Sequence, residues 1–129
     1  MHSVAGPLII PDLATVALGS NLKWEPFRPG IEIVRLCPAD TGEASAFLRY
    51  APGAKLQRHT HRGWEHILIL SGSQIDEAGC HQAGALLVHP PGSSHSVSSD
   101  EGCIVLAIWE KPVTFIPEIE SQSIMTSAR

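Results

Sequence analysis

The sequence of 129 residues has the length of one domain, because a single hydrophobic core usually closes at about 100–150 residues. Its hydrophobic content of 43% and charged content of 17% are those of a globular protein, and they exclude a disordered or fibrous chain. Nine Lys and Arg residues face thirteen Asp and Glu residues, for a formal charge of -4, without any basic run. We therefore expect no nucleic-acid partner.

The first thirty residues are weakly patterned, and we expect residues 1–30 to supply a peripheral strand or a strand exchanged between copies. This segment lacks a basic leader and is interrupted by Pro7 and Pro11, so it is a poor signal peptide. No apolar run reaches the roughly 20 residues of a membrane span. The three cysteines, an odd number without CxxC spacing, indicate a reducing compartment. We therefore predict a cytoplasmic protein without a membrane partner.

From residue 31 onward, short apolar runs alternate with turns that contain Gly or Pro, which favours an all-β fold. The pattern predicts eight strands, at residues 31–36, 43–50, 55–61, 64–70, 73–76, 85–90, 95–99 and 103–110. Turn residues separate them, among others at 38–42 and at 71–72. Eight short strands in one domain predict a double-sheet jelly roll. The polar segment 119–129 is expected to be loosely held.

Three histidines and one glutamate are predicted to share one space inside this barrel. His59 and His61 are two residues apart on a strand, so they project from the same face, with Gln57 beside them. A turn after His61 would return Glu65 to the pair, and His95 begins a later strand. These ligand types suit one divalent metal ion, and they leave zinc, iron, manganese and nickel open. The alternative, a polar cluster without metal, is disfavoured because an unpartnered buried carboxylate is costly.

The spacing of these residues resembles the two motifs of the cupin family. Five residues match every fixed position of the first motif, at 53–72: Gly53, His59, His61, Glu65 and Gly72. Four residues match the second motif, at 84–99: Gly84, Pro90, Gly92 and His95. The last position of the second motif is usually Asn and is Ser99 here. The resemblance implies the cupin double-stranded β-helix, a jelly-roll barrel, with a metal held by the three histidines and the glutamate.

Residues 72–106 also resemble the cupin domain of the ChrR-type anti-sigma factors. In those regulators the cupin domain binds a divalent metal, usually described as zinc, and follows a helical domain that holds the sigma factor through its own zinc site. This sequence has no His-x-x-x-Cys-x-x-Cys segment, so the resemblance does not imply a sigma-factor partner. The cupin resemblance does imply a homodimer, formed through sheet faces or exchanged N-terminal strands.

Two classes of function follow from such a metal site. As an enzyme, the protein would be a metal-dependent dioxygenase or isomerase acting on a small oxygenated organic molecule, with Glu65 as a candidate proton shuttle. As a regulator, it would be a stand-alone ChrR-like sensor with a closed zinc site and no turnover. A storage or structural role is a third alternative. We favour the enzyme here, because the ligand set is complete and no partner-binding segment is recognised.

The remaining histidines are predicted to pack or to face solvent. His66 falls on the face opposite Glu65, and His81 lies in a predicted turn. His89 comes directly before the Pro-Pro-Gly turn, where packing is the favoured interpretation and a place at the cavity mouth is the alternative.

Other side chains are assigned by strand alternation and residue type. The inward positions near the site are predicted to be Phe47, Arg49, Gln57, Ile67 and Ile69. Packing in the core or at an interface, rather than substrate binding, is predicted for Trp64, Trp109 and Phe47. Core burial is predicted for Cys103, and a redox role is not favoured for Cys80. A solvated rim, with an anion-binding mouth as the alternative, is predicted for Lys55, Arg58 and Arg62.

Overall fold

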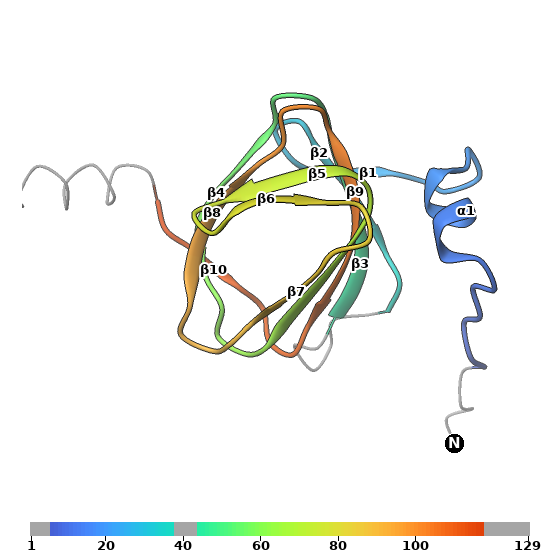
Figure 1. Cartoon of the computed structure of the whole chain (residues 1–129). Coiled ribbons are helices and arrows are strands. Elements are labelled where there is room, and N and C mark those ends of the chain that lie inside the picture. The colour runs from blue at the N-terminus through green and yellow to red at the C-terminus, as the bar shows by residue number, and fades with distance from the viewer. Residues whose placement is uncertain (1–5, 38–43, 118–129) are drawn as a thin grey trace, which may run out of the picture.

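The computed structural model describes residues 6–37 and 44–117. Within them the chain forms one short helix and ten strands, which curl into a barrel (Figure 1). The elements are α1 (Leu13–Leu18), β1 (Glu25–Arg28), β2 (Ile31–Arg35), β3 (Ala44–Tyr50), β4 (Lys55–Thr60), β5 (Glu65–Asp76), β6 (Gly79–Gln82), β7 (Leu86–His89), β8 (Ser94–Ser98), β9 (Cys103–Trp109) and β10 (Thr114–Phe115). The all-β jelly-roll prediction is confirmed. The predicted turn at 38–42 and the predicted tail at 119–129 lie outside the described residues.

The strand order is β1-β2-β3-β9-β5-β8-β4-β10, and β6 and β7 also pair with β5. The first half of β5 pairs with β9 and β7, and its second half pairs with β6 and touches β8. All of these pairings are antiparallel. Because β5 takes part in both halves of the barrel, it is the strand that joins them.

β5 runs without a break through the turn predicted at Ser71 and Gly72. The prediction of two strands, at 64–70 and 73–76, is wrong because the backbone stays paired: Ser71 lies opposite Ile104 and Gly72 opposite Cys103. A register shift between Ile69 and Ser71 marks a bulge, which bends the strand from one half of the barrel into the other. Gly72 has a φ of 71°, a conformation that glycine adopts without steric cost.

Four elements carry too little pattern to be predicted: α1, β1, β6 and β10. In α1, Asp12 caps the first turn by accepting from the Thr15 N–H at 3.2 Å, and Ala17 is the buried residue. β1 pairs with β2 of the same chain, while the exchange of residues 1–30 between copies stays a prediction. Across residues 6–37 and 44–117, no helix is long and apolar enough to cross a membrane.

The interior of the barrel is filled by aliphatic side chains, including Ile31, Ile33, Leu48, Leu56, Ile67, Ile69, Val97 and Val105. The predicted inward direction of Ile67 and Ile69 is confirmed. These two residues alternate along β5 with less buried neighbours, as a strand with one face toward the core requires.

The predicted inward direction of Phe47 and Arg49 is wrong. Leu48 and Tyr50 belong to the buried core of the barrel, so their neighbours on β3 lie on the opposite face. There Phe47 is still fully buried, and Arg49 donates from Nη2 to Glu32 Oε1 at 2.8 Å. Positions 46–48 are apolar and buried without a gap, so the sequence pattern of β3 leaves the phase of alternation undetermined.

Candidate metal centre

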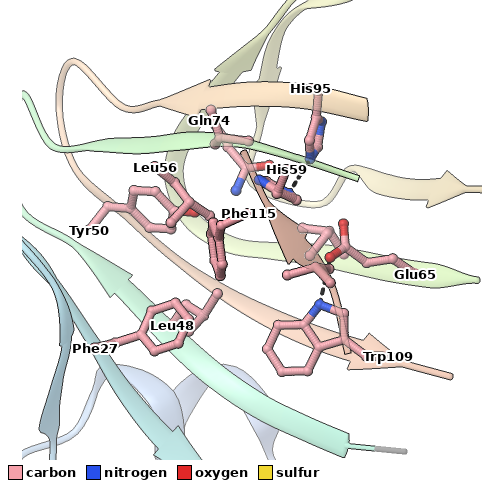
Figure 2. Close-up of a pocket in the computed structure, with 13 residues that line it drawn as sticks. Phe27, Leu48, Tyr50, Leu56, His59, Glu65, Gln74, His95, Trp109 and Phe115 are labelled. Atoms are coloured by element: carbon pink, nitrogen blue, oxygen red, sulfur yellow. Dashed lines mark hydrogen bonds between the residues drawn. The ribbon is translucent and has the colours of Figure 1, made fainter. Parts of the chain in front are cut away.

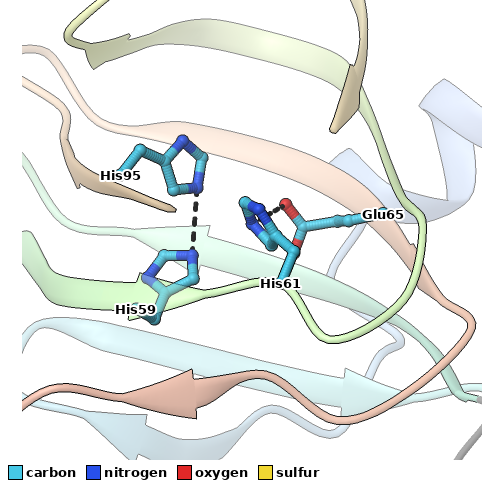
Figure 3. A group of neighbouring side chains, drawn as sticks. All are labelled: His59, His61, Glu65 and His95. Atoms are coloured by element: carbon cyan, nitrogen blue, oxygen red, sulfur yellow. Dashed lines mark hydrogen bonds and ion pairs between the residues drawn. The ribbon is translucent and has the colours of Figure 1, made fainter. Parts of the chain in front are cut away.

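Four buried side chains from three segments meet inside the barrel (Figure 3). His59 on β4 lies directly opposite His95 on β8, His61 follows β4, and Glu65 begins β5. One ligand atom from each of the four residues lies within 4.8 Å of the others. The structure therefore brings together the four residues that the sequence predicts as metal ligands.

A bulge in β4 decides which side chains face this cluster. The register of β4 against β8 shifts between Leu56 and His59, so both of these residues are buried although they are three positions apart. Gln57 is exposed for the same reason, and the prediction that it lies beside His59 is wrong. Its side-chain Nε2 instead donates to the carbonyl oxygen of Ile116 at 3.1 Å.

The Nδ1 atoms of His59 and His95 are held by acceptors outside the cluster. His59 Nδ1 lies 2.9 Å from the carbonyl oxygen of Gln57. His95 Nδ1 lies 3.3 Å from Asp76 Oδ2. A carbonyl oxygen and a carboxylate can only accept, so both Nδ1 atoms are assigned the ring proton. In each neutral ring, Nε2 then carries an unprotonated lone pair.

The same assignment holds for His61. Its Nδ1 lies 2.9 Å from Ser93 Oγ, which donates its own hydrogen to the Pro90 carbonyl oxygen at 2.6 Å. Because the Ser93 hydroxyl proton is committed, Ser93 accepts from His61 Nδ1–H. All three histidines therefore direct an Nε2 lone pair toward the interior of the cluster.

These inward atoms face one another without a proton between them. His59 Nε2 and His95 Nε2 lie 3.0 Å apart. His61 Nε2 lies 3.0 Å from Glu65 Oε1, yet it is buried and has no hydrogen-bond partner. Lone pairs and a carboxylate that converge in a buried space repel one another unless a cation lies among them. This donor set of three nitrogens and one oxygen fits a single divalent metal ion.

Glu65 is oriented by Trp109, its neighbour across β5 and β9. Trp109 Nε1 donates to Glu65 Oε2 at 2.6 Å, which leaves Oε1 for the cluster (Figure 2). Carboxylate ligands of metals are commonly fixed in this way by an outer hydrogen bond. Residue type predicts packing for Trp109. In the structure Trp109 also lines the cavity beside the cluster and positions Glu65, a role that depends on the pairing of β9 with β5.

Replacement of Trp109 by phenylalanine is expected to weaken metal binding about 10- to 100-fold, because the carboxylate loses the donor that orients it. Competition titration against a coloured chelator measures the affinity. Trp64→Phe is the matched control, since Trp64 directly precedes Glu65 in the chain but is 46% exposed. Equal affinities of the two variants would contradict the positioning role of the indole N–H.

Burial sets the protonation states of the cluster. It lowers the pKa of His59, and it lowers the pKa of His95 to about 4. Burial alone would raise the pKa of Glu65, but positive charge on the His61 ring, when that ring is protonated, and the Trp109 N–H outweigh it, so that pKa lies below its ordinary value. Neutral imidazole and ionised carboxylate are the forms that bind metal.

The metal-free protein is expected to lose stability as the pH falls from 6.5 toward about 4, because His95 takes up a proton there when unfolded but not when folded. The free energy of unfolding should fall by at most about 1.4 kcal/mol per pH unit for this histidine. Urea unfolding across this pH range, with chelator present, measures the slope. His95→Gln should give a shallower slope than the wild type; parallel slopes would contradict the argument.

A small cavity adjoins the cluster on its interior side (Figure 2). Its volume is about 20 Å³, which is room for one water molecule. Most of its lining is apolar, but Tyr50 and Gln74 also border it. Gln74 is buried, and its Oε1 has no hydrogen-bond partner. A water molecule or another donor of that size would satisfy this acceptor.

The other histidines lie around the centre. His66 lies on the outer face of β5, as predicted, opposite Val88 of β7. The turn predicted for His81 is wrong, because the chain turns at residues 77–78 and His81 lies on β6. His89 packs its ring on that of His61, with centroids 4.9 Å apart and planes 13° apart. It is not among the residues that line the cavity.

The predictions for the remaining residues have mixed outcomes. Cys103 is buried in the core as predicted, and Cys80 is exposed. Trp64 is exposed and thus not a core residue, and its place at an interface stays a prediction. The rim is solvent-exposed, as predicted for Lys55, Arg58 and Arg62. The anion-binding alternative for this rim stays a prediction.

The site and fold agree with the comparison to known families. Residues 14–113 match the ChrR cupin-like domain family, and the chain belongs to it. The chain is 31% identical over 98 residues to the anti-sigma-E factor ChrR of Cereibacter sphaeroides, an alignment that covers 74% of this chain and 45% of the relative. It thus spans less than half the length of that relative. The predicted cupin and ChrR resemblance is confirmed.

Solved structures share the fold. The complex of Rhodobacter sphaeroides SigE with the anti-sigma factor ChrR matches with a TM-score of 0.66 at 23% identity, covering 75% of this chain and 54% of that chain. An acetylacetone dioxygenase from Acinetobacter johnsonii matches with a TM-score of 0.71 at 16% identity, covering 100% of this chain and 96% of that chain. A putative acetylacetone dioxygenase from Methylibium petroleiphilum matches with a TM-score of 0.70 at 14% identity, covering 95% of this chain and 98% of that chain. At these identities the likeness shows a common fold alone.

Proposed function

We propose that this protein is a ChrR-like sensor module whose buried centre holds one divalent metal ion without turning over an organic substrate. The observation that carries the proposal is the convergence of three Nε2 lone pairs and Glu65 Oε1 in a buried space. Membership of the ChrR cupin-like family supports it. The metal would be held by His59, His61, Glu65 and His95.

The size of the adjoining cavity favours a sensor over an enzyme. Pockets that enclose organic ligands usually measure about 300–1,000 Å³. The cavity beside the metal centre measures about 20 Å³, enough for water or a molecule of similar size, such as hydrogen peroxide. An organic substrate would therefore require the interior of the barrel to open. A small diffusible ligand would require no such change.

A bound ion would supply Lewis-acid charge, and the chain's own residues would control access to it. The Nδ1 partners of the three histidines keep their Nε2 lone pairs directed inward. Trp109 leaves Glu65 Oε1 free, and Gln74 Oε1 offers an acceptor for one small donor beside the centre. Burial of all four ligating residues excludes bulk water.

Metal analysis tests the proposal. Protein purified without added metal is expected to hold about one divalent ion per chain, and its cobalt(II)-substituted form should show the intense visible bands of a tetrahedral site. His59→Ala should hold much less metal. Metal far below one equivalent in both proteins would overturn the metal centre, and a six-coordinate cobalt spectrum would count against a closed sensor site.

A metal-dependent dioxygenase or isomerase is the second candidate. Two features favour this candidate. A cavity bordered by Gln74 reaches the cluster, and Glu65 Oε1 is unprotonated and could serve as a proton shuttle. Anaerobic loading with iron(II), followed by oxygen uptake with a panel of β-diketones, separates the candidates. The sensor predicts no uptake above that of His59→Ala. Uptake in proportion to added diketone would replace the sensor with the enzyme.

We also propose a homodimer in the cytoplasm, with no sigma-factor partner for this chain. The outer face of β7 and β9 supports the dimer, because Leu86, Val88 and Ile108 are 62%, 47% and 45% exposed there. Light scattering on purified protein is expected to give twice the chain mass of 13.9 kDa. A monomer at micromolar concentration would contradict this assembly.

A further inference from the structure

A second set of potential metal ligands shares one residue with the buried centre. Asp76, His89 and His95 each direct one ligand atom to within 4.8 Å of the other two. As whole residues Asp76 and His89 are half-buried, but the side chain of Asp76 is 3% exposed and that of His89 is 17% exposed. His89 is therefore the member of the second set, named here the outer set, whose side chain is the most exposed.

His89 contributes an imidazole that no other contact satisfies. It pairs across β7 and β5 with Glu65, and its Nε2 lies 4.0 Å from Glu65 Oε1. This Nε2 atom is buried and has no hydrogen-bond partner. The ring meets that of His95 edge-on, with centroids 4.5 Å apart. A buried ring nitrogen without a partner next to a carboxylate and two imidazoles indicates an unfilled ligand position.

Asp76 contributes a carboxylate with one oxygen fixed and the other directed at His95. Its Oδ1 accepts from the Ala78 N–H at 2.9 Å and lies 2.8 Å from His81 Nε2. Its Oδ2 lies 3.3 Å from His95 Nδ1. Two contacts thus hold the carboxylate in place and leave Oδ2 for a cation beside His95.

His95 can serve only one set at a time, because each of its ring nitrogens faces a different set. With Nε2 bound to an ion in the buried centre, the ring proton is on Nδ1 and is donated to Asp76. With Nδ1 bound to an ion in the outer set, the proton is on Nε2 and is donated to His59 Nε2, 3.0 Å away. Transfer of the ion inward returns this proton from Nε2 to Nδ1, so the ring stays neutral and the number of bound protons does not change.

We propose that Asp76, His89 and His95 form a capture position, at which a divalent cation binds before it passes to the buried centre. The proposal rests on metal binding by that centre. The outer set offers a carboxylate and two imidazoles beside the partly exposed ring of His89, so an ion that enters past His89 can exchange its waters stepwise for protein ligands. Direct loading would require the ion to lose its water shell in one step inside the barrel.

The rate of metal uptake tests the capture position. Apo-protein is mixed with cobalt(II), and the visible absorption of the buried site is followed by stopped flow for the wild type, His89→Gln and His66→Gln. His89→Gln is expected to slow uptake and release alike, by about 10-fold or more, and to leave the dissociation constant unchanged within about threefold. His66→Gln, which removes a histidine from the outer face of the same barrel, should behave as the wild type.

Three results would overturn the capture position. Uptake by His89→Gln at the wild-type rate removes the need for His89. A weaker affinity with unchanged uptake makes His89 a ligand of the buried site instead. A folded His61→Ala variant that binds no cobalt(II) also contradicts the capture position. In this variant the outer set should retain one weakly held ion, and the double variant His61→Ala/His89→Gln should lose that ion. If wild-type protein binds no ion at all, the proposed function fails together with the capture position. If it binds an ion and gives one of the three results above, only the capture position fails.

Discussion

Replacement of His61 by alanine is expected to lower the affinity of the protein for divalent metal by roughly 100- to 1,000-fold. Structural zinc sites with four protein ligands bind with about 10–16 kcal/mol, so one ligand in four carries about 2.5–4 kcal/mol. His61 is 1% exposed, and its Nε2 is directed at the cluster without a partner. No water can replace it easily in such a buried position.

The measurement is a competition titration with a coloured chelator, together with the metal content of the purified variants. His66→Ala is the matched control, because His66 lies on the outer face of β5 and contributes nothing to the cluster. Circular dichroism of both metal-free variants checks that they fold. Equal metal content in His61→Ala and His66→Ala would show that the metal binds elsewhere in the protein.

The sequence predicts the strands of this fold better than their connections. All eight predicted segments lie in strands, and they make seven strands because 64–70 and 73–76 are both parts of β5. The break predicted at Ser71 and Gly72 is absent, since the pairing of β5 with β9, far along the chain, keeps the glycine inside the ladder. The short strands β1, β6 and β10 exist only because a neighbour supplies their hydrogen bonds, which no local pattern can indicate.

The same division between local and distant information applies to the site. The spacing of His59, His61 and Glu65 follows from strand geometry, and the second motif adds His95. The hydrogen bond from Trp109 and the carboxylate of Asp76 depend on strand register, which pairs residues more than forty positions apart in the case of Trp109 and Glu65. The bulge that turns Gln57 outward also leaves no mark in the residue types of β4.

Replacement of Gly72 by alanine is expected to destabilise the protein by about 3–5 kcal/mol, at the upper end of single-residue effects. Its φ of 71° lies in the left-handed region, and a Cβ there would overlap the carbonyl group of Gly102 and come within 3.0 Å of Cys103 Cα. These are backbone atoms of the paired strand, so they cannot move aside without breaking the ladder between β5 and β9.

Gly53→Ala separates the two causes of this loss. Gly53 also has a positive φ, of 83°, but a Cβ there would meet no atom within 4 Å. Only the conformational cost of about 1–2 kcal/mol is therefore expected at Gly53. Urea unfolding of both variants without metal measures the difference, and equal losses would refute the steric argument. The two glycines that bound the first motif are thus required for different reasons: Gly53 for its backbone conformation, and Gly72 also for the close approach of β9, which holds Trp109 against Glu65.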